Sequence, residues 1–172
     1  MHLIDLTSSD TQPLEFSQRL DLAADCCGED VVRVGEVQIE GAVECTGGGY
    51  HFSGRMTGEA TLRCGRCLGE FSIPLDERVE LELRPLASAP REDEIRIGKA
   101  ELDVVFFETP SLDLAVVAAE QVQLSVPMKP LCRESCRGFC PRCGKNLNEG
   151  LCECPPETDA RWAALQQWRS SE

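Results

Sequence analysis

The stretch CRESCRGFCPRCGKNLNEGLCEC, residues 132–154, places six cysteines within 23 residues. Its most compact part runs from Cys140 through Pro141 and Arg142 to Cys143 and Gly144. Two thiolates at this spacing can bind one tetrahedral ion, and the glycine that follows permits the tight turn around the ion. This pattern is typical of a zinc knuckle.

A second pair of cysteines follows the knuckle after the turn-forming residues Asn146, Asn148 and Gly150. The stretch therefore predicts one structural Zn²⁺ held chiefly by four thiolates, those of Cys140, Cys143, Cys152 and Cys154. Cys132 and Cys136 can replace one of these pairs, or all six cysteines can hold two ions, and the sequence leaves these alternatives open. The two histidines, His2 and His51, lie far from the stretch, which favours a structural over a catalytic site.

Another knuckle, Cys64-Gly65-Arg66-Cys67, lies between two predicted strands and is a second candidate metal site. One pair cannot saturate zinc, so these two cysteines must take ligands from the C-terminal stretch, bind metal weakly or remain a reduced pair. Arg66 should favour the thiolate, which makes a dithiol oxidoreductase the enzymatic alternative. Redox pairs usually lie between a strand and a helix, however, whereas this one lies between two strands. Cys26 and Cys27 have no nearby partner pair and are interpreted as structural or incidental.

The 172-residue chain is 42% hydrophobic and 27% charged, and it contains no apolar run of membrane-spanning length. Its first residues lack the basic start and long apolar region of a signal peptide, so we expect a cytoplasmic protein with no membrane partner. In a reducing compartment the eleven cysteines are expected to be metal ligands or buried thiols rather than disulfides.

Charge is distributed unevenly along the chain, whose net charge is −13. Residues 1–127 contain 10 Lys or Arg and 24 Asp or Glu, whereas residues 128–169 contain 7 basic and 5 acidic residues. The acidic part repels a phosphate backbone and attracts a basic chain. We therefore divide the chain into a domain of residues 1–127 and a Cys-rich zinc-binding lobe with a C-terminal helix, residues 128–172.

Alternating apolar residues predict a twisted antiparallel meander over roughly residues 14–107. Gly35 and Gly41 indicate a bend or bulge in the second strand, and the glycines at 47–49 form a turn. His51 is expected to be a surface or cross-strand side chain. The predicted strands are residues 14–22, 31–45, 50–62 and 71–83, followed after a polar linker by 94–107.

A helix is predicted over residues 112–124, with Ser111 as its N-cap and an apolar face that packs across the sheet. That face contains Leu114, Val117, Ala118, Gln121, Val122 and Leu124. A last helix, residues 159–168, places Trp162, Leu165 and Trp168 on one stripe, which either packs on the protein or docks a partner. The predicted fold class is α+β: an antiparallel meander packed by one helix, with a small C-terminal Cys-rich lobe and a terminal helix.

Several separate segments between residues 60 and 168 form a recognisable combination. They include Cys64–Cys67 with its internal Arg66, and the C-terminal cysteine stretch that contains Gly144-Lys145-Asn146-Leu147-Asn148. The others are Leu112-Asp113-Leu114, Glu120 and the run Val126 to Cys132. In order, spacing and flanking residues these segments resemble the YceD family, and the resemblance covers most of residues 60–168.

The resemblance implies a role in ribosome biogenesis, through accumulation of large-subunit (23S) ribosomal RNA. The expected partners are a ribosomal protein, large-subunit rRNA or both, with no small-molecule substrate. Because the chain is acidic, we favour a basic ribosomal protein, with RNA contacts limited to the lobe; direct RNA binding by a zinc-ribbon-like module is the alternative. The residues expected to bind partners are Arg137, Arg142, Lys145, Arg161 and Trp162, with Arg133 as a further RNA contact.

No enzymatic activity is expected. The chain lacks a phosphate-binding GxxxxGK[ST] loop, a GxSxG elbow and an HExxH helix.

Overall fold

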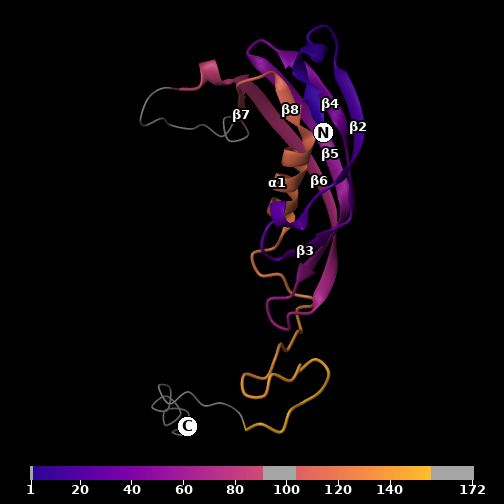
Figure 1. The fold of residues 1–172 in the computed structure, drawn as a ribbon, viewed down its shortest axis with the longest axis vertical. Helices are drawn as coiled ribbons and strands as arrows, with labels where there is room; N and C mark the ends of the chain where they lie inside the picture. Colours follow the sequence, from indigo (N-terminus) through magenta and orange to yellow (C-terminus); the bar gives the residue numbers. More distant parts are fainter. Residues whose placement is uncertain (1, 91–103, 156–172) are drawn as a thin grey trace, which may run out of the picture.

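The computed structural model describes residues 2–90 and 104–155, and its centre is one twisted six-stranded sheet (Figure 1). Strand order along the sheet is β2-β4-β5-β6-β7, and β3 pairs with β5 beyond the end of β4. A separate two-stranded sheet joins β1 to β8. The strands are β1 (Leu3–Asp5), β2 (Leu14–Asp21), β3 (Val31–Val34), β4 (Glu36–Thr46), β5 (Gly49–Arg63), β6 (Glu70–Pro85), β7 (Val104–Phe107) and β8 (Ser111–Asp113). The helices are α1 (Leu114–Ser125) and three short 3₁₀ turns, η1 (Leu6–Ser9), η2 (Ala24–Cys26) and η3 (Leu86–Ser88).

Strands β2, β4, β5 and β6 pair antiparallel, close to the predicted bounds. The predicted strand 31–45 is divided at Gly35, where pairing with β5 shifts by one residue between Val34↔Ala60 and Gln38↔Thr57. Gly35 still donates its N–H to the carbonyl oxygen of Glu59 at 2.8 Å. The expected irregularity is therefore a bulge at Gly35, whereas Gly41 lies within β4.

Strand β7 departs from the predicted meander, because it pairs parallel to β6, with Glu82 opposite Val104. A parallel neighbour needs a connection of a dozen or more residues, and residues 86–103 provide that length. Of the predicted strand 94–107, only Val104–Phe107 lies within the described residues. The predicted helix 159–168, with Arg161 and Trp162, lies outside them.

Helix α1 begins two residues later than predicted. Its N-cap is Asp113, whose Oδ1 accepts a hydrogen bond from the N–H of Ala115 at 2.9 Å. Ser111 is not the cap, because residues Ser111–Asp113 form β8 and pair with β1. The choice between cap and strand was thus decided by a partner strand more than 100 residues away.

The helix covers one face of the sheet, and the core lies between them (Figure 1). Its buried residues are Leu114, Val117, Ala118, Ala119 and Val122, whereas Leu124 is 78% exposed, contrary to expectation. At about 100° per residue, Leu124 lies roughly 120° from the centre of this buried stripe. From the sheet, the largest buried side chains facing α1 include Ile39, Phe52, Met56 and Leu75.

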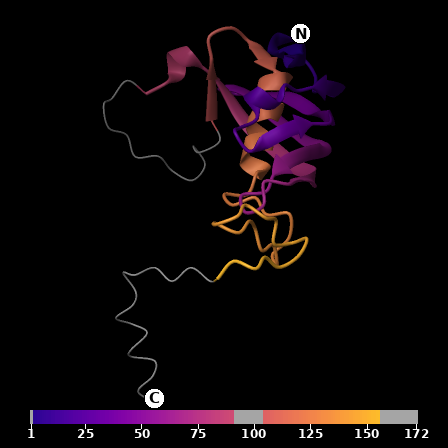
Figure 2. The ribbon, with the colours of Figure 1, turned by 60° about the horizontal axis from the view of Figure 1, so that its bottom comes forward.

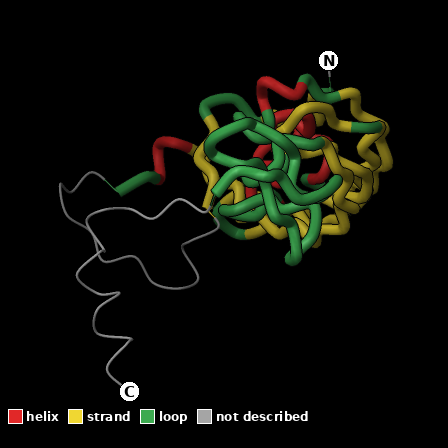
Figure 3. Tube along the Cα trace, turned by 90° about the horizontal axis from the view of Figure 1, so that it is seen from below, coloured by secondary structure: helices red, strands yellow, loops and turns green. Residues whose placement is uncertain are grey.

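After α1 the chain forms a lobe, defined here as residues 126–155, at the end of the sheet where β5 turns into β6 (Figures 1 and 2). Viewed from this end, the lobe consists of loops and turns (Figure 3). Its regular pairing is a single antiparallel bridge between Phe139 and Asn146. The α+β prediction, with a sheet, one packing helix and a Cys-rich C-terminal lobe, is confirmed.

Candidate metal centres

The knuckle Cys64–Cys67, here called the first knuckle because it comes first in the chain, forms the turn between β5 and β6. Cys140–Cys143 is called the second knuckle. The N–H of Leu68 donates to the carbonyl oxygen of Cys64, and the N–H of Cys64 donates to that of Gly69, both at 2.9 Å. Leu68 closes the turn with a left-handed backbone, φ 52°. These two bonds fold the Cys-x-x-Cys segment into a compact loop.

The second knuckle repeats this geometry. The N–H of Gly144 donates to the carbonyl oxygen of Cys140, and the N–H of Cys140 donates to that of Lys145, again at 2.9 Å each. Gly144 takes the left-handed position, φ 71°, that Leu68 occupies in the first knuckle. The same local hydrogen-bond pattern is therefore encoded twice in the chain.

Four thiols meet at the first knuckle, and we call this group cluster one: Cys64, Cys67, Cys132 and Cys136. All four sulfur atoms lie within 4.8 Å of one another. The Sγ atoms of Cys64 and Cys136 are 3.8 Å apart, as are those of Cys67 and Cys132. Phe71 and Leu131 pack against the buried cysteines, so cluster one lies in a small core of its own.

The second knuckle meets the last cysteine pair, and we call this group cluster two: Cys140, Cys143, Cys152 and Cys154. Its sulfur atoms also lie within 4.8 Å of one another. Cys140 is buried, Cys152 and Cys154 are half-buried and Cys143 is exposed. Cluster two is thus the more accessible of the two groups.

The structure brings the four predicted principal ligands together, and it matches the alternative in which Cys64 and Cys67 take two ligands from the C-terminal stretch. Cys132 and Cys136 join Cys64 and Cys67 rather than replacing a pair in cluster two. Outside both clusters, Cys27 is buried in the main core, and Cys26 and Cys45 are exposed.

Sulfur spacing in cluster one fits a metal ion better than a disulfide. With zinc–sulfur bonds of about 2.3 Å, the sulfur atoms of a tetrahedral site are about 3.8 Å apart. A disulfide requires a separation of about 2.05 Å. The two 3.8 Å contacts of cluster one match the edges of such a tetrahedron.

The pKa values of the thiols in the clusters also favour binding of a cation. Burial raises the pKa of Cys64, but hydrogen bonds from backbone N–H groups, including those of Arg66 and Cys67, bring that pKa down to about 6. Burial and the neighbouring thiols raise the pKa of Cys132 to about 12.

In cluster two, backbone N–H groups of Cys143 and Arg142 lower the pKa of Cys140 to about 6, whereas the Cys143 thiol and burial raise the pKa of Cys154 to about 12. Four thiolates so close together need a positive charge between them, and a divalent ion provides it.

Arg66 has a role that the sequence did not reveal. Its Nη1 donates to the carbonyl oxygens of Glu134 at 3.2 Å and Cys136 at 2.9 Å. The guanidinium thus binds the lobe backbone. The redox interpretation had assumed instead that it favours a thiolate of the knuckle. Gly138 packs so closely on the Arg66 carbonyl that a Cβ at this position would lie 2.8 Å from that oxygen.

The predicted partner-binding cations of the lobe divide into two kinds. Lys145 donates through Nζ to the carbonyl oxygen of Leu151 at 2.9 Å, and Arg133 donates to Oδ1 of Asn148 at 3.0 Å. Among the described residues, the guanidinium groups of Arg137 and Arg142 have no hydrogen-bond or ion-pair partner, and both residues are exposed. Arg137 and Arg142 are therefore the cations most available to a partner.

The sheet face opposite α1, here called the open face, is acidic. Strand register places on it ten carboxylates, those of Glu15, Asp21, Glu36, Glu40, Glu44, Glu59, Glu70, Asp76, Glu80 and Glu82. The same register gives this face six guanidinium groups, those of Arg19, Arg33, Arg55, Arg63, Arg78 and Arg84. Carboxylates thus outnumber guanidinium groups on this surface.

Ion pairs neutralise only part of the open face. Arg55 binds Asp76 through two hydrogen bonds of 2.6 Å, and Arg19 lies 3.6 Å from Glu36. His51 makes a hydrogen bond of 3.1 Å to Glu82 across the strands, which fits its predicted cross-strand position.

Glu77 belongs to the opposite face of the sheet from Glu80 and Glu82. It lies across from Met56, and its Oε1 accepts a hydrogen bond from Ser125 of α1 at 3.1 Å. Glu77 thus provides an internal control for charges on the open face.

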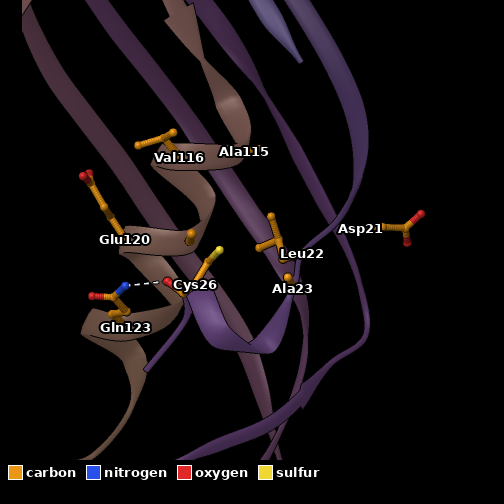
Figure 4. Close-up of a pocket in the computed structure, with 9 residues that line it drawn as sticks. Asp21, Leu22, Ala23, Cys26, Ala115, Val116, Glu120 and Gln123 are labelled. Carbon is orange, nitrogen blue, oxygen red and sulfur yellow. Dashed lines mark hydrogen bonds between the residues drawn. The ribbon is translucent and has the colours of Figure 1, made fainter. Parts of the chain in front are cut away.

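An open groove of about 390 Å³ lies between η2 and α1 (Figure 4). Ala115, Val116 and Ala119 form its helical wall, and Gln123 donates to the carbonyl oxygen of Cys26 at 2.6 Å. The carboxylates of Asp21 and Glu120 point in different directions, away from Cys26 (Figure 4). Its lining residues therefore do not form an arrangement suited to acid–base or nucleophilic catalysis.

Fold and clusters together define an α+β protein in which a sheet and a cysteine-rich lobe share a four-thiol centre. The chain belongs to the YceD family: the family model described as "Large ribosomal RNA subunit accumulation protein YceD" matches residues 52–168. This match includes both knuckles and confirms the resemblance seen in the sequence. The family description names accumulation of the large ribosomal RNA subunit.

Three bacterial relatives are similar over most of the chain. The uncharacterized proteins Rv2926c of Mycobacterium tuberculosis and Mb2951c of Mycobacterium bovis are each 28% identical over 136 residues, 76% of this chain and 60% of the relative. The uncharacterized protein YlbN of Bacillus subtilis is 25% identical over 161 residues, 91% of this chain and 88% of YlbN. The chain spans about 60% of the length of the mycobacterial relatives. No solved structure matches the chain significantly.

Across residues 2–90 and 104–155, no helix has both the length and the apolar character needed to cross a membrane.

Proposed function

We propose that this protein is a non-enzymatic, cytoplasmic assembly factor that supports accumulation of large-subunit (23S) rRNA by holding a basic ribosomal protein. The single observation that carries the proposal is the acidic open face, where carboxylates exceed cations. Ribosomal proteins that bind rRNA need basic surfaces, and an acidic sheet is complementary to them.

We further propose that clusters one and two each hold a structural Zn²⁺. Zinc accepts four thiolates in tetrahedral geometry without redox chemistry. Each Zn²⁺ with four thiolates adds two negative charges to a chain that already carries −13. Loading both sites therefore makes RNA a less favourable first partner and strengthens attraction to a basic protein.

The lobe is proposed to reach rRNA next to the bound ribosomal protein. Arg137 and Arg142 support this role because they are exposed and unpaired among the described residues. In this arrangement the acidic part, residues 1–127, contacts protein, and the lobe lies toward RNA. Cluster one joins the two parts, because it takes two cysteines from each.

The test separates the two surfaces by charge. Glu44→Gln/Glu80→Gln removes two charges from the open face, and Glu77→Gln/Glu120→Gln removes two charges on the side of the sheet that α1 covers. Binding of purified basic large-subunit ribosomal proteins should weaken roughly three- to tenfold in the first variant and stay near wild type in the second. Equal losses in both variants would show that net charge alone attracts the partner.

Direct RNA binding by the lobe is the competing function, favoured by the exposure of Arg137 and Arg142. Arg137→Gln/Arg142→Gln should weaken binding to naked 23S rRNA while sparing binding to a ribosomal protein. Tight binding of wild type to naked 23S rRNA at physiological salt, with no binding to ribosomal proteins, would replace the proposed function with this one.

A dithiol redox role remains the enzymatic alternative, because the pKa of Cys64 is lowered to about 6. Both knuckle thiols are buried beside two further cysteines, which favours metal binding. Slow alkylation of Cys64 that becomes fast only with a chelator supports the metal, whereas rapid, reversible oxidation of metal-loaded protein supports the enzyme.

A further inference from the structure

The two clusters are in contact through one side chain. Asn148 lies on the loop between Cys143 and Cys152, the loop that cluster two closes. Its Nδ2 donates to Sγ of Cys136, a member of cluster one, at 3.4 Å. A residue positioned by one cluster therefore hydrogen-bonds a thiol of the other.

Asn148 is held rigidly in this position by four further hydrogen bonds. Its Oδ1 accepts from the N–H of Arg137 at 2.9 Å and from Nη2 of Arg133 at 3.0 Å. Its own N–H and Nδ2 both donate to Oδ1 of Asn146, at 3.0 and 2.9 Å. Because each polar atom of the side chain has a partner, the amide has a defined orientation toward the sulfur.

The backbone makes the same connection. Gly138, between Cys136 and Cys140, accepts from the N–H of Leu147 at 2.9 Å and packs against Arg66 of the first knuckle. Phe139 pairs with Asn146 across the loop of cluster two. Residues 136–139 and 146–148 therefore form one small unit between the two clusters.

We propose that Asn148 couples the two metal sites, so that metal binding at cluster two strengthens metal binding at cluster one. This inference rests on the proposed binding of zinc by both clusters. Metal at cluster two fixes the loop that carries Asn148, and the amide then stabilises the Cys136 thiolate toward its own metal. Groups that hydrogen-bond a metal ligand typically change metal affinity by about 10- to 100-fold.

Coupling of this kind is reciprocal. Metal at cluster one fixes Cys136, and through it the Asn148 amide, which favours the ordered loop at cluster two. The chain therefore passes from the metal-free form to the form with two metals with little of the singly loaded form. Asn148 is a positioning residue here, since it acts through Cys136 and not on the ion.

Zinc affinity of the full-length chain is measured by chelator competition in a double-mutant cycle. Cys143→Ser/Cys152→Ser removes cluster two, and it should lower the zinc affinity of cluster one by about 10- to 100-fold when Asn148 is present. In an Asn148→Ala background the same change should cost less than about threefold. An equal loss in both backgrounds would overturn the coupling.

A second measurement does not depend on disabling a cluster. In full-length protein loaded with two cadmium ions, ¹¹³Cd resonances report each tetrathiolate site separately. Asn148→Asp keeps the acceptor of the bonds from Arg137 and Arg133 but loses the N–H donor to Cys136. It should shift the cluster-one resonance and promote release of that ion, whereas Glu149→Ala, which removes an acceptor for Asn146, should leave the resonance in place.

The outcomes separate this inference from the proposal on which it rests. Failure of wild type to bind two metal ions would overturn the proposed zinc sites themselves. Two bound ions with a cluster-one resonance unchanged by Asn148→Asp would leave the zinc sites intact and overturn the coupling alone.

Discussion

Cluster one joins two cysteine pairs that are at least 65 residues apart in sequence, whereas all four cysteines of cluster two lie within residues 140–154. Closing the longer loop costs about 2 kcal/mol more in chain entropy. Folding of the sheet offsets this cost, since Gly65 donates to the carbonyl oxygen of Pro130 at 2.8 Å and this bond helps to hold the two segments together. Two knuckles of the same geometry therefore have different roles: the first attaches the lobe to the sheet, and the second folds a local loop.

The comparison predicts different consequences when each cluster loses a ligand, and this is the largest expected effect. Structural zinc contributes on the order of 10 kcal/mol to small domains. Cys64→Ser should release residues 128–139 from the sheet, whereas Cys140→Ser should loosen mainly residues 140–155, as measured by hydrogen exchange. Zinc content should fall from two ions to about one or fewer in each variant.

The sheet itself is the control, because its core is built without either cluster. Exchange in β4 and β5 should remain slow in both variants. Zinc that is absent from wild type, or lost only in Cys64→Ser, would contradict the assignment of cluster two.

Zinc affinity should fall with decreasing pH in a similar way at both clusters, because Cys64 and Cys140 both have a pKa of about 6 before metal binds. Between pH 6 and 8 these two are already mostly thiolates, while Cys132 and Cys154, with pKa values of about 12, must release a proton to the solvent. Affinity should therefore rise with pH throughout, and its slope should steepen below about pH 6 as Cys64 and Cys140 become protonated.

Calorimetry in buffers of different ionisation enthalpy measures this proton release directly. Fewer than four protons per zinc are expected at pH 7.5, and more at pH 5.5. A release of four protons per zinc at both pH values would contradict the lowered pKa of Cys64 and Cys140.

Two left-handed glycines in the lobe should respond unequally to alanine. A Cβ added at Gly144, φ 71°, would have no other atom within 4 Å, so Gly144→Ala should cost about 1 kcal/mol of backbone strain. At Gly138, φ 70°, the added Cβ also meets the carbonyl oxygen of Arg66 at 2.8 Å, and Gly138→Ala should cost about 2–4 kcal/mol.

Unfolding of the metal-loaded lobe by guanidinium, followed by hydrogen exchange, gives both free energies. Equal costs at the two glycines would show that the contact between Gly138 and Arg66 contributes little to attaching the lobe.

The smallest effect is expected at Leu68, which takes the left-handed position that glycine takes in the second knuckle. Leu68→Gly relieves about 1 kcal/mol of strain and loses little buried surface, because Leu68 is 59% exposed. The greater freedom of glycine in the unfolded chain offsets part of this gain, leaving a stabilisation of about 0.5 kcal/mol in the same unfolding measurement. Leu68→Ala is the control, since alanine relieves no strain there, and an equal gain from alanine would contradict the explanation.

Local features of the sequence were sufficient for much of this protein. Side-chain alternation located β2, β4, β5 and β6, because a strand buried on one face needs a period of two. The Cys-x-x-Cys spacing located both knuckles, since two residues between ligands and a left-handed residue after them form the turn regardless of the surrounding fold.

The tertiary structure alone decided which distant segments meet. Cys132 and Cys136 lie beside Cys64 and Cys67 because the sheet places the β5–β6 turn where α1 delivers residue 130, and no local pattern records that position. Likewise, the 18-residue connection between β6 and β7 allows either strand direction, and only the folded structure shows that β7 runs parallel to β6. Ser111 enters β8 because β1 is there to pair with it. Residue spacing specifies a turn or a strand within a few residues, whereas ligand sets and strand partners depend on contacts that form only when the whole chain has folded.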